Sequence, residues 1–218
     1  YLHGNAENIS SHIASVAWLP MSGVGMLALD YRGFGASTGR ALVPDVFQDI
    51  EAAAIWIRQQ FPESRFVVLG QSIGASLSVP FVAKAQYQYQ IDGLVLEAPF
   101  AGFGSVARDM LTQNWIGTLV WPFTWLVPDE WDPQNWAGLI QVPVLQIHSR
   151  DDQVVSIEQG RRLFERFENS ALQAESISEP GLSQIESPQW IEARGPHIAA
   201  FADPSIRAQV LSFVKRID

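Results

Sequence analysis

The segment Gly70-Gln71-Ser72-Ile73-Gly74 places a serine between two glycines, and it is the part of the chain whose chemistry is easiest to anticipate. It follows an apolar run that predicts a buried strand and precedes a pattern that predicts a helix over about 73–86. In a strand, turn and helix of this kind the serine occupies a strained bend, and the flanking glycines leave room for that bend. The segment therefore predicts that Ser72 is a nucleophile. The alternative is that Ser72 only caps the helix, a position that serine favours.

A serine nucleophile needs a base, and the base needs an acid that orients it. Of the four histidines, only His197 comes after all the predicted strands, in a loop that can reach the carboxyl edge of a parallel sheet. Asp151 and Asp152 directly follow a predicted strand, which places them at the same edge, where open α/β sheets bind ligands. Ser72, Asp152 and His197 are thus a candidate catalytic triad.

Each partner of the serine also has a simpler interpretation. A loop histidine such as His197 is often a surface residue, and an aspartate after a strand is often a turn former. His12, on a predicted helix, is a rival base, whereas His148 at a strand end is more readily a structural residue. No histidine pair has a ligand spacing such as H-x-x-x-H, so the sequence predicts no metal site, and the triad chemistry requires no cofactor.

The elements that would position these residues alternate regularly. The predicted strands are the short apolar runs 24–29, 65–69, 91–96 and 142–147, with a weaker one at 172–177. The predicted helices are at about 10–19, 43–60, 73–86, 156–167 and 204–215. This alternation predicts an α/β fold with a mostly parallel central sheet and helices on both faces. A length of 218 residues fits a single domain, 1–218.

Two intervals depart from this alternation. Residues of about 100–139 predict a small cap-like insertion over the sheet, rich in aromatic side chains. Phe100, Trp115, Trp121 and Trp125 in this insertion are candidates for a substrate pocket, and the alternative is that they only pack the cap onto the core. The second interval, 178–195, predicts a loop longer than the usual connection, and such loops are often functional.

Composition excludes several classes of protein. Apolar residues make up 47% of the chain and charged residues 17%, which is typical of a globular protein rather than a disordered one. The formal net charge of −9 argues against a nucleic-acid partner. The chain has no cysteine, so disulfides, thiolate metal sites and cysteine nucleophiles are excluded. The first residues show no signal peptide, and the uncharged stretch 115–127 is too short to span a bilayer.

Five segments together resemble α/β-hydrolases that use a serine nucleophile, and the resemblance covers nearly the whole chain. They are His3-Gly4-Asn5, the run DYRGFGAS at 30–37, the Gly70 to Gly74 turn, Glu97-Ala98-Pro99-Phe100, and the run HSRDDQVV at 148–155. The first two most resemble the branch of bud-emergence-type hydrolases and relatives of acyl-protein thioesterases, sometimes described as serine aminopeptidase-like.

The resemblance implies a role for each matched residue. The family nucleophile falls on Ser72, its acid on Asp152 rather than Asp151, and its base on His197. The oxyanion hole would consist of the backbone N–H groups of Asn5 and Ile73.

The resemblance also implies a strand that leads into the His3-Gly4-Asn5 motif and lies between two other strands of the sheet. Only Tyr1 and Leu2 represent it here. We therefore expect that residues upstream of Tyr1 complete this strand and make a longer chain more stable. A targeting signal or membrane anchor would lie there too, so localisation stays open between the cytoplasm and a membrane surface.

The sequence thus predicts a serine hydrolase that cleaves a carboxylic ester or thioester with an apolar acyl group, on a small molecule or an acylated protein. One alternative is an aminopeptidase or amidase, in which Asp129, Glu130 and Asp132 could hold a substrate ammonium group. Another is a binding protein that keeps the fold without catalysis. Membrane association, through the aromatic insertion or an upstream segment, is a further alternative. A dehalogenase is disfavoured because Ser72 stands where an aspartate nucleophile is needed.

Overall fold

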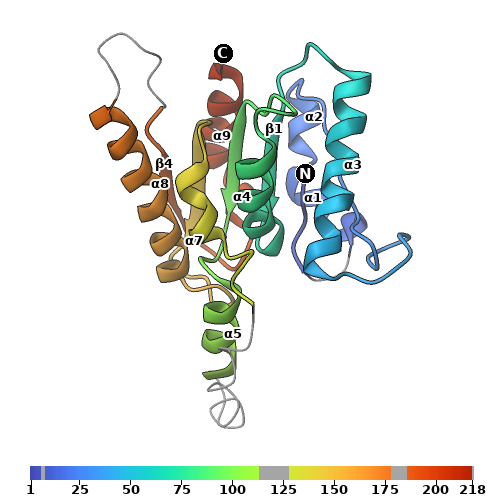
Figure 1. Cartoon of the computed structure of the whole chain (residues 1–218). Coiled ribbons are helices and arrows are strands. Elements are labelled where there is room, and N and C mark those ends of the chain that lie inside the picture. The colour runs from blue at the N-terminus through green and yellow to red at the C-terminus, as the bar shows by residue number, and fades with distance from the viewer. Residues whose placement is uncertain (6–7, 113–127, 178–185, 218) are drawn as a thin grey trace.

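The centre of the molecule is a sheet of parallel strands. The structure is a computed structural model that describes residues 1–5, 8–112, 128–177 and 186–217. The strands lie in the spatial order β1 (Val67–Gln71), β2 (Gly93–Glu97), β3 (Val144–Ser149) and β4 (Gln189–Ala193), and each neighbouring pair is parallel. All carboxyl ends therefore lie at one edge of the sheet, at the lower end of the molecule in Figure 1.

The first residues of the chain extend this pairing beyond β1. The Leu2 amide donates to the Leu69 carbonyl at 2.8 Å, and the Gln71 amide donates to the Leu2 carbonyl at 3.0 Å. On the other side, the Leu29 amide donates to the Tyr1 carbonyl at 3.2 Å. Leu2 thus forms parallel bridges with both neighbours, which places the segment that enters the His3-Gly4-Asn5 motif between β1 and Leu29.

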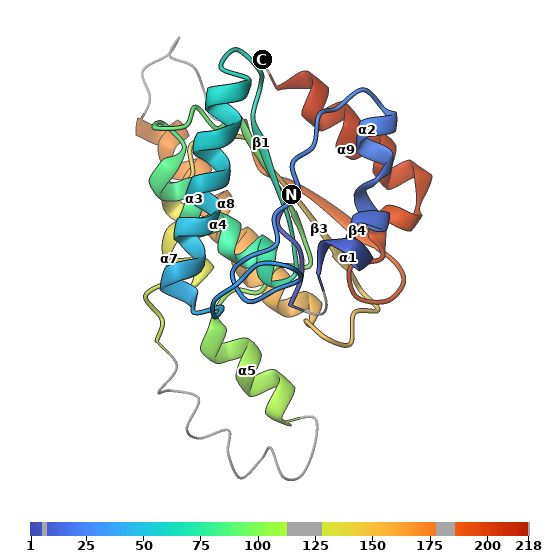
Figure 2. The same cartoon turned by 90° about the vertical axis from the view of Figure 1, so that its right-hand side faces the viewer.

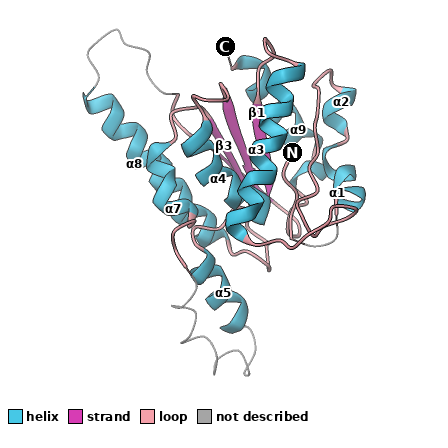
Figure 3. Ribbon diagram, turned by 45° about the vertical axis from the view of Figure 1, so that its right-hand side comes forward, coloured by secondary structure: helices cyan, strands magenta, loops and turns pink. Residues whose placement is uncertain are grey.

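Helices cover both faces of the sheet (Figures 2 and 3). One face carries α3 (Val43–Gln60), α4 (Ile73–Ala85), α7 (Pro133–Trp136), the 3-10 turn η2 (Ala137–Leu139) and α8 (Ile157–Ile177). The other face carries α1 (Ile9–Val16), α2 (Trp18–Met21), the 3-10 turn η3 (Ala200–Ala202) and α9 (Pro204–Arg216). The predicted α/β architecture with a parallel sheet and two helical layers is confirmed.

The strands read as continuous apolar runs because both of their faces are buried. Along β2, Leu94 and Leu96 pack into the core on the α3, α4 and α8 side, whereas Val95 packs into the core on the α1 and α9 side. The alternation follows from the two-residue period of a strand. The helix that follows β1, α4, is buried around most of its circumference, so the element behind Ser72 is fixed by packing on every side.

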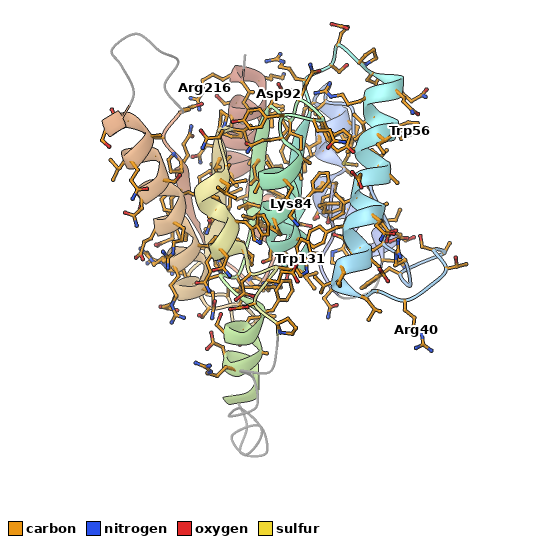
Figure 4. All side chains as sticks on the ribbon, viewed as in Figure 1. Arg40, Trp56, Lys84, Asp92, Trp131 and Arg216 are labelled. Carbon is orange, nitrogen blue, oxygen red and sulfur yellow. The ribbon has the colours of Figure 1, made fainter. Side chains whose placement is uncertain are left out.

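The predicted insertion leaves the core as α5 (Phe103–Thr112), which projects beyond the carboxyl ends of the strands (Figure 1). Trp115, Trp121 and Trp125 lie outside the described residues. The chain returns at Trp131 and Trp136, whose rings stack, and the ammonium group of Lys84 on α4 lies 3.9 Å and 4.5 Å from their centroids. Figure 4 shows Lys84 directed toward Trp131. This cation–π contact fixes the returning chain to α4.

Three expectations about elements are wrong. Residues 172–177 are the last turns of α8 rather than a strand, because a run rich in alanine, glutamate and glutamine continues the helix. The predicted loop 178–195 contains β4, which a short run with tryptophan and isoleucine forms. Residues 24–29 are not a strand and meet the first residues of the chain at two points: the Tyr1 amino group donates to the Leu27 carbonyl at 2.6 Å, and Leu29 forms a bridge with Leu2. In addition, the predicted helix 10–19 is divided into α1 and α2.

Within the ranges that the structure describes, no helix is both long enough and apolar enough to cross a membrane.

The two ends of α8 differ in burial, which gives a test of the helix assignment. Leu163 is fully buried, whereas Leu172 is 63% exposed. We expect Leu163→Ala to lower the free energy of unfolding by about 2 to 5 kcal/mol, because it leaves a cavity in the core. Leu172→Ala should change it by less than about 0.5 kcal/mol. Urea unfolding of both variants measures this, and a large loss for Leu172→Ala would indicate a buried strand at 172–177.

Candidate active site

Ser72 lies on a strained bend between β1 and α4. Its backbone has φ 55° and ψ −120°, a conformation that costs a residue with a side chain about 1 to 3 kcal/mol. The Ser72 amide donates to the Glu97 carbonyl at 2.8 Å, which ties the bend to β2. Ser72 precedes the first residue of α4, but its side chain makes no capping hydrogen bond to that helix. The hydroxyl is therefore directed elsewhere, which answers the alternative that Ser72 is only a helix cap.

The two glycines of this bend are required by close backbone approaches. A Cβ on Gly70 would lie 2.5 Å from the Ala75 Cα, and a Cβ on Gly74 would lie 2.2 Å from the Leu2 carbonyl oxygen. Real Cβ atoms do not tolerate such distances. The glycines thus allow α4 to start directly behind β1 and directly against the segment that leads into His3-Gly4-Asn5.

The structure brings Ser72, His197 and Asp152 together in one chain of hydrogen bonds. The Ser72 Oγ lies 2.8 Å from the His197 Nε2, and the His197 Nδ1 lies 2.7 Å from the Asp152 Oδ2. A carboxylate only accepts, so Nδ1 carries the proton and Nε2 presents a lone pair to the serine hydroxyl. The Asp152 side chain is fully buried, and the His197 side chain is 16% exposed. This is the arrangement in which a serine hydroxyl loses its proton to a neighbouring base.

The Asp152 carboxylate is prepared to stay ionised. Its Oδ1 accepts the amides of Val154 at 2.8 Å and Val155 at 3.0 Å, and its Oδ2 faces His197. Burial alone would raise the pKa of Asp152, but the hydrogen bonds from His197, Val155 and Val154 outweigh it and hold the pKa below its ordinary value. The acid therefore keeps its negative charge beside the imidazole at neutral pH.

The loop that carries His197 follows directly from β4. Gly195, at φ 99°, donates its amide to the Asp151 Oδ2 at 3.1 Å, and its carbonyl accepts the Ser149 hydroxyl at 2.5 Å. Ser149 ends β3 and Asp151 lies in the turn that follows, so the turn that carries Asp152 also holds the histidine loop. Asp151 thus contacts the loop backbone, and it is Asp152 that contacts the imidazole.

One predicted oxyanion donor, Ile73, directly follows the nucleophile, and the residue before the other, Gly4, lies beside it. Ile73 is the first residue of α4, and Gly4 lies so close to Ser72 that a Cβ on it would be 3.5 Å from the serine Cβ. Asn5 follows Gly4 at the surface. The main chain at His3 is held by a hydrogen bond from the Tyr31 hydroxyl to its carbonyl at 3.1 Å. Hence the DYRGFGAS segment supports the loop on which the Asn5 amide lies.

His12 and His148, two of the other three histidines, have other contacts. His12 on α1 stacks on His3 with a centroid separation of 5.4 Å, and the imidazole that contacts Ser72 is that of His197. His148 is buried, and its Nε2 lies 2.9 Å from the Val155 carbonyl oxygen. Burial lowers the pKa of His148, so it stays neutral and holds the turn that positions Asp152.

Of the predicted pocket residues, the structure describes Phe100. It lies in a small apolar cluster with Val106 and Val155, against which Ile73 and Phe103 pack. This cluster borders both the nucleophile turn and the Asp152 turn. Trp115, Trp121 and Trp125 lie outside the described residues.

The three acidic residues that the aminopeptidase alternative needs differ in burial. Asp132 is buried and accepts the Phe103 amide at 2.7 Å, so its carboxylate supports the start of α5. Asp129 and Glu130 are exposed. Among the residues with a described position, no group of three or more histidines and carboxylates is arranged to hold a metal ion.

A second buried carboxyl group, Glu97, was missed by the reasoning from sequence. The signal that could have indicated it is a glutamate at the end of an apolar strand. Its side chain accepts the Ala200 amide at 2.8 Å and the Gln71 side-chain amide at 2.5 Å. Burial raises the pKa of the Glu97 carboxyl to about 7, even though these two hydrogen bonds lower it.

The chain is similar in sequence and in fold to known proteins. Residues 1–135 match the family model described as "Serine aminopeptidase, S33". The chain is 31% identical over 176 residues to the protein YfhR of Salmonella typhi, a match that covers 75% of this chain and 57% of that protein. Over 186 residues it is 27% identical to the human protein ABHD12B, covering 81% of this chain and 51% of that protein. The chain thus spans little more than half the length of these relatives.

Among solved structures, an esterase of Pyrococcus furiosus superimposes with a TM-score of 0.72 at 22% identity, covering 99% of this chain and 78% of that one. At that identity the likeness concerns the fold alone. With the family match over more than half of the chain, the conclusion is that this protein belongs to the serine aminopeptidase family of α/β-hydrolases.

Proposed function

We propose that this protein is a serine hydrolase of the esterase type in which Ser72 is the nucleophile, His197 the base and Asp152 the orienting acid. The observation that carries the proposal is the continuous chain of hydrogen bonds from the Ser72 Oγ to the Asp152 carboxylate. It ends on a serine held in a strained backbone conformation between two glycines that cannot carry a side chain. A merely structural serine needs neither feature.

The reaction follows from the proton positions. The His197 Nε2 accepts the proton of Ser72 as its Oγ attacks the substrate carbonyl carbon. The carbonyl π electrons move to oxygen, and the amides of Ile73 and Asn5 donate to that oxyanion. When the intermediate collapses, the bond to the leaving alcohol or thiol breaks, and His197 returns its proton to the leaving group. Water then attacks the acyl-enzyme with His197 again as base, which releases the acid and restores Ser72.

An apolar acyl group is the substrate that the surroundings favour. The cluster of Phe100, Val106 and Val155 borders the bend at Ser72 and offers a hydrophobic wall on the α5 side. The Pyrococcus protein is described as an esterase, and a structural neighbour from Paleococcus ferrophilus as a monoacylglycerol lipase. These descriptions agree with ester cleavage, and a thioester of the same acyl group would present the same carbonyl to Ser72.

An aminopeptidase is the second candidate, because the family model carries that description. Such an enzyme needs a carboxylate that binds the substrate ammonium group. Asp132 is committed to the Phe103 amide, which leaves the exposed Asp129 and Glu130 for that purpose. Exposed carboxylates bind an ammonium group weakly, since water screens the charges.

The first prediction concerns the nucleophile. A fluorophosphonate probe should add once to the protein, and Ser72→Ala should abolish the adduct and lower ester turnover by about 10³-fold or more. Intact-mass analysis measures the adduct without presuming a substrate. Ser10→Ala, at an exposed serine of α1, is the control and should label like the wild type. A folded wild-type protein that does not react would instead favour the non-catalytic binding protein.

The second prediction concerns the substrate class. With one acyl chain presented as an oxygen ester, a thioester and an anilide, and with leucine p-nitroanilide beside them, kcat/KM should be highest for the two esters. It should exceed the value for the aminoacyl anilide by about 10²-fold or more, because Asp132 is bound to the Phe103 amide and the exposed Asp129 and Glu130 bind an ammonium group weakly. Faster cleavage of leucine p-nitroanilide would reverse the order of the two candidate functions.

The third prediction concerns the oxyanion hole. Gly74→Ala would drive a Cβ against the Leu2 and His3 carbonyls and displace the loop that carries the Asn5 amide. The rate of phosphonylation should fall by about tenfold or more, as expected when one oxyanion donor is misplaced. Gly138→Ala, where a Cβ meets nothing within 4 Å, should react like the wild type. Equal rates for Gly74→Ala and the wild type would contradict the assignment of Asn5.

A further inference from the structure

A buried carboxyl group that the triad does not use lies behind the nucleophile. Glu97 is the last residue of β2, is 2% exposed, and lies on the sheet face covered by α1 and α9. Its Oε1 accepts the Ala200 amide at 2.8 Å, and its Oε2 accepts the side-chain amide of Gln71 at 2.5 Å. Its main-chain carbonyl accepts the Ser72 amide at 2.8 Å.

These three contacts join the two halves of the proposed triad. Gln71 is covalently next to Ser72 and pairs with Glu97 across β1 and β2. Ala200 begins η3, three residues after His197, and the turn between them contains Ile198 at φ 51°. One side chain therefore binds the strand end that presents the nucleophile and the turn that presents the base.

We propose that Glu97 is a positioning residue for the hydrolysis reaction, which holds the His197 turn against the nucleophile strand and, when ionised, supplies a second negative charge that favours the imidazolium formed during catalysis. The inference rests on the proposed function of Ser72 and His197. Glu97 acts on the reaction through His197 and not by contact with the substrate.

A purely structural role would not need a charge here. Glutamine at this position could accept the same amide and would avoid the cost of burying a carboxylate. The titratable groups that interact electrostatically with Glu97 are His197 and Asp152 from the two catalytic loops and the Tyr1 hydroxyl from the segment beside β1. Of these, only His197 gains positive charge during the reaction. An ionised Glu97 therefore stabilises the transition state more than the resting state.

The contacts of Gln71 allow both protonation states of Glu97 to be satisfied. The Gln71 Oε1 accepts the Ser15 hydroxyl at 3.1 Å and also the Tyr1 hydroxyl. If the amide group of Gln71 reverses, its oxygen can accept a hydrogen bond from a neutral Glu97, and its NH₂ can donate to the two hydroxyls. The same reversal lets a glutamine at position 97 form every hydrogen bond, so Glu97→Gln should fold.

The experiment compares wild type, Glu97→Gln and Glu97→Asp in the hydrolysis of p-nitrophenyl butyrate across the pH range. Since burial raises the pKa of Glu97 to about 7, the wild-type carboxyl is neutral, like glutamine, at about pH 5.5 and ionised at about pH 8.5. The ratio of wild-type to Glu97→Gln kcat should rise from near 1 at the lower pH to about tenfold at the higher pH, with KM little changed.

The thermal stability of the wild type should fall with rising pH, whereas the kcat ratio should rise. A carboxyl whose pKa is raised on folding contributes stability that is present below its unfolded value and is lost as pH rises through the folded value. The wild type should therefore lose thermal stability between about pH 4.5 and 7, and Glu97→Gln should have the higher midpoint at about pH 8.5. Glu97→Asp keeps the charge, so the ratio of its kcat to that of the wild type should not vary with pH. Glu51→Gln, at a carboxylate on α3 that accepts the Tyr89 hydroxyl, is the control for the substitution itself.

Each result of these measurements either supports or overturns the proposed role of Glu97. A wild-type to Glu97→Gln ratio that is constant with pH, or a Glu97→Gln midpoint below the wild type at every pH, would show a structural residue and overturn the inference. If Glu97→Gln does not fold, a kcat ratio of wild type to Glu97→Asp that changes with pH overturns it. A wild type that neither hydrolyses the ester nor reacts with a fluorophosphonate would overturn the proposed function itself, which is a different result from an active wild type with an indifferent Glu97.

Discussion

The backbone conformation of Ser72 is the constraint on which the rest of the site depends. At φ 55° and ψ −120° the residue is strained, and surrounding structure must hold it there. The hydrogen bond from its amide to the Glu97 carbonyl does so from one side, and the buried helix α4 does so from the other. The bend lifts the hydroxyl out of the line of β1 and turns it toward the carboxyl edge of the sheet.

The parallel sheet explains how residues so far apart in sequence meet at that edge. Strands β1, β3 and β4 each deliver one member of the Ser72, Asp152 and His197 set at the carboxyl end, because every parallel strand begins at the opposite edge. The loops that follow are then fixed to one another by short polar contacts, such as those from Ser149 and Asp151 to Gly195. Glu97, at the end of β2, completes the series, so all four strand ends contribute to the same polar cluster.

The sequence predicted those parts of the structure that depend on local sequence patterns. The Ser72 turn, the strands β1 to β3 and the helices α3, α4 and α9 follow from apolar periodicity and from glycine at positions of close approach, and both the fold and the family are confirmed. The sequence misled where local signals conflict or are too short, and where a contact joins distant residues. Residues 172–177 have an apolar pattern that suits a strand, yet their helix formers extend α8, and β4 is a five-residue edge strand too short to give a period. The role of Glu97 depends on Ala200 and Gln71, which no spacing in the sequence connects.

The most direct test of this account is a crystal structure of the protein after reaction with a fluorophosphonate. The phosphorus atom stands in for the tetrahedral carbon, and its free oxygen for the oxyanion. We predict a covalent bond to the Ser72 Oγ, with the phosphoryl oxygen at about 2.7–3.1 Å from the amides of Ile73 and Asn5. The His197 imidazole should remain hydrogen-bonded to Asp152. A phosphonate attached to another residue, or one whose oxygen faces solvent away from both amides, would contradict the proposed site.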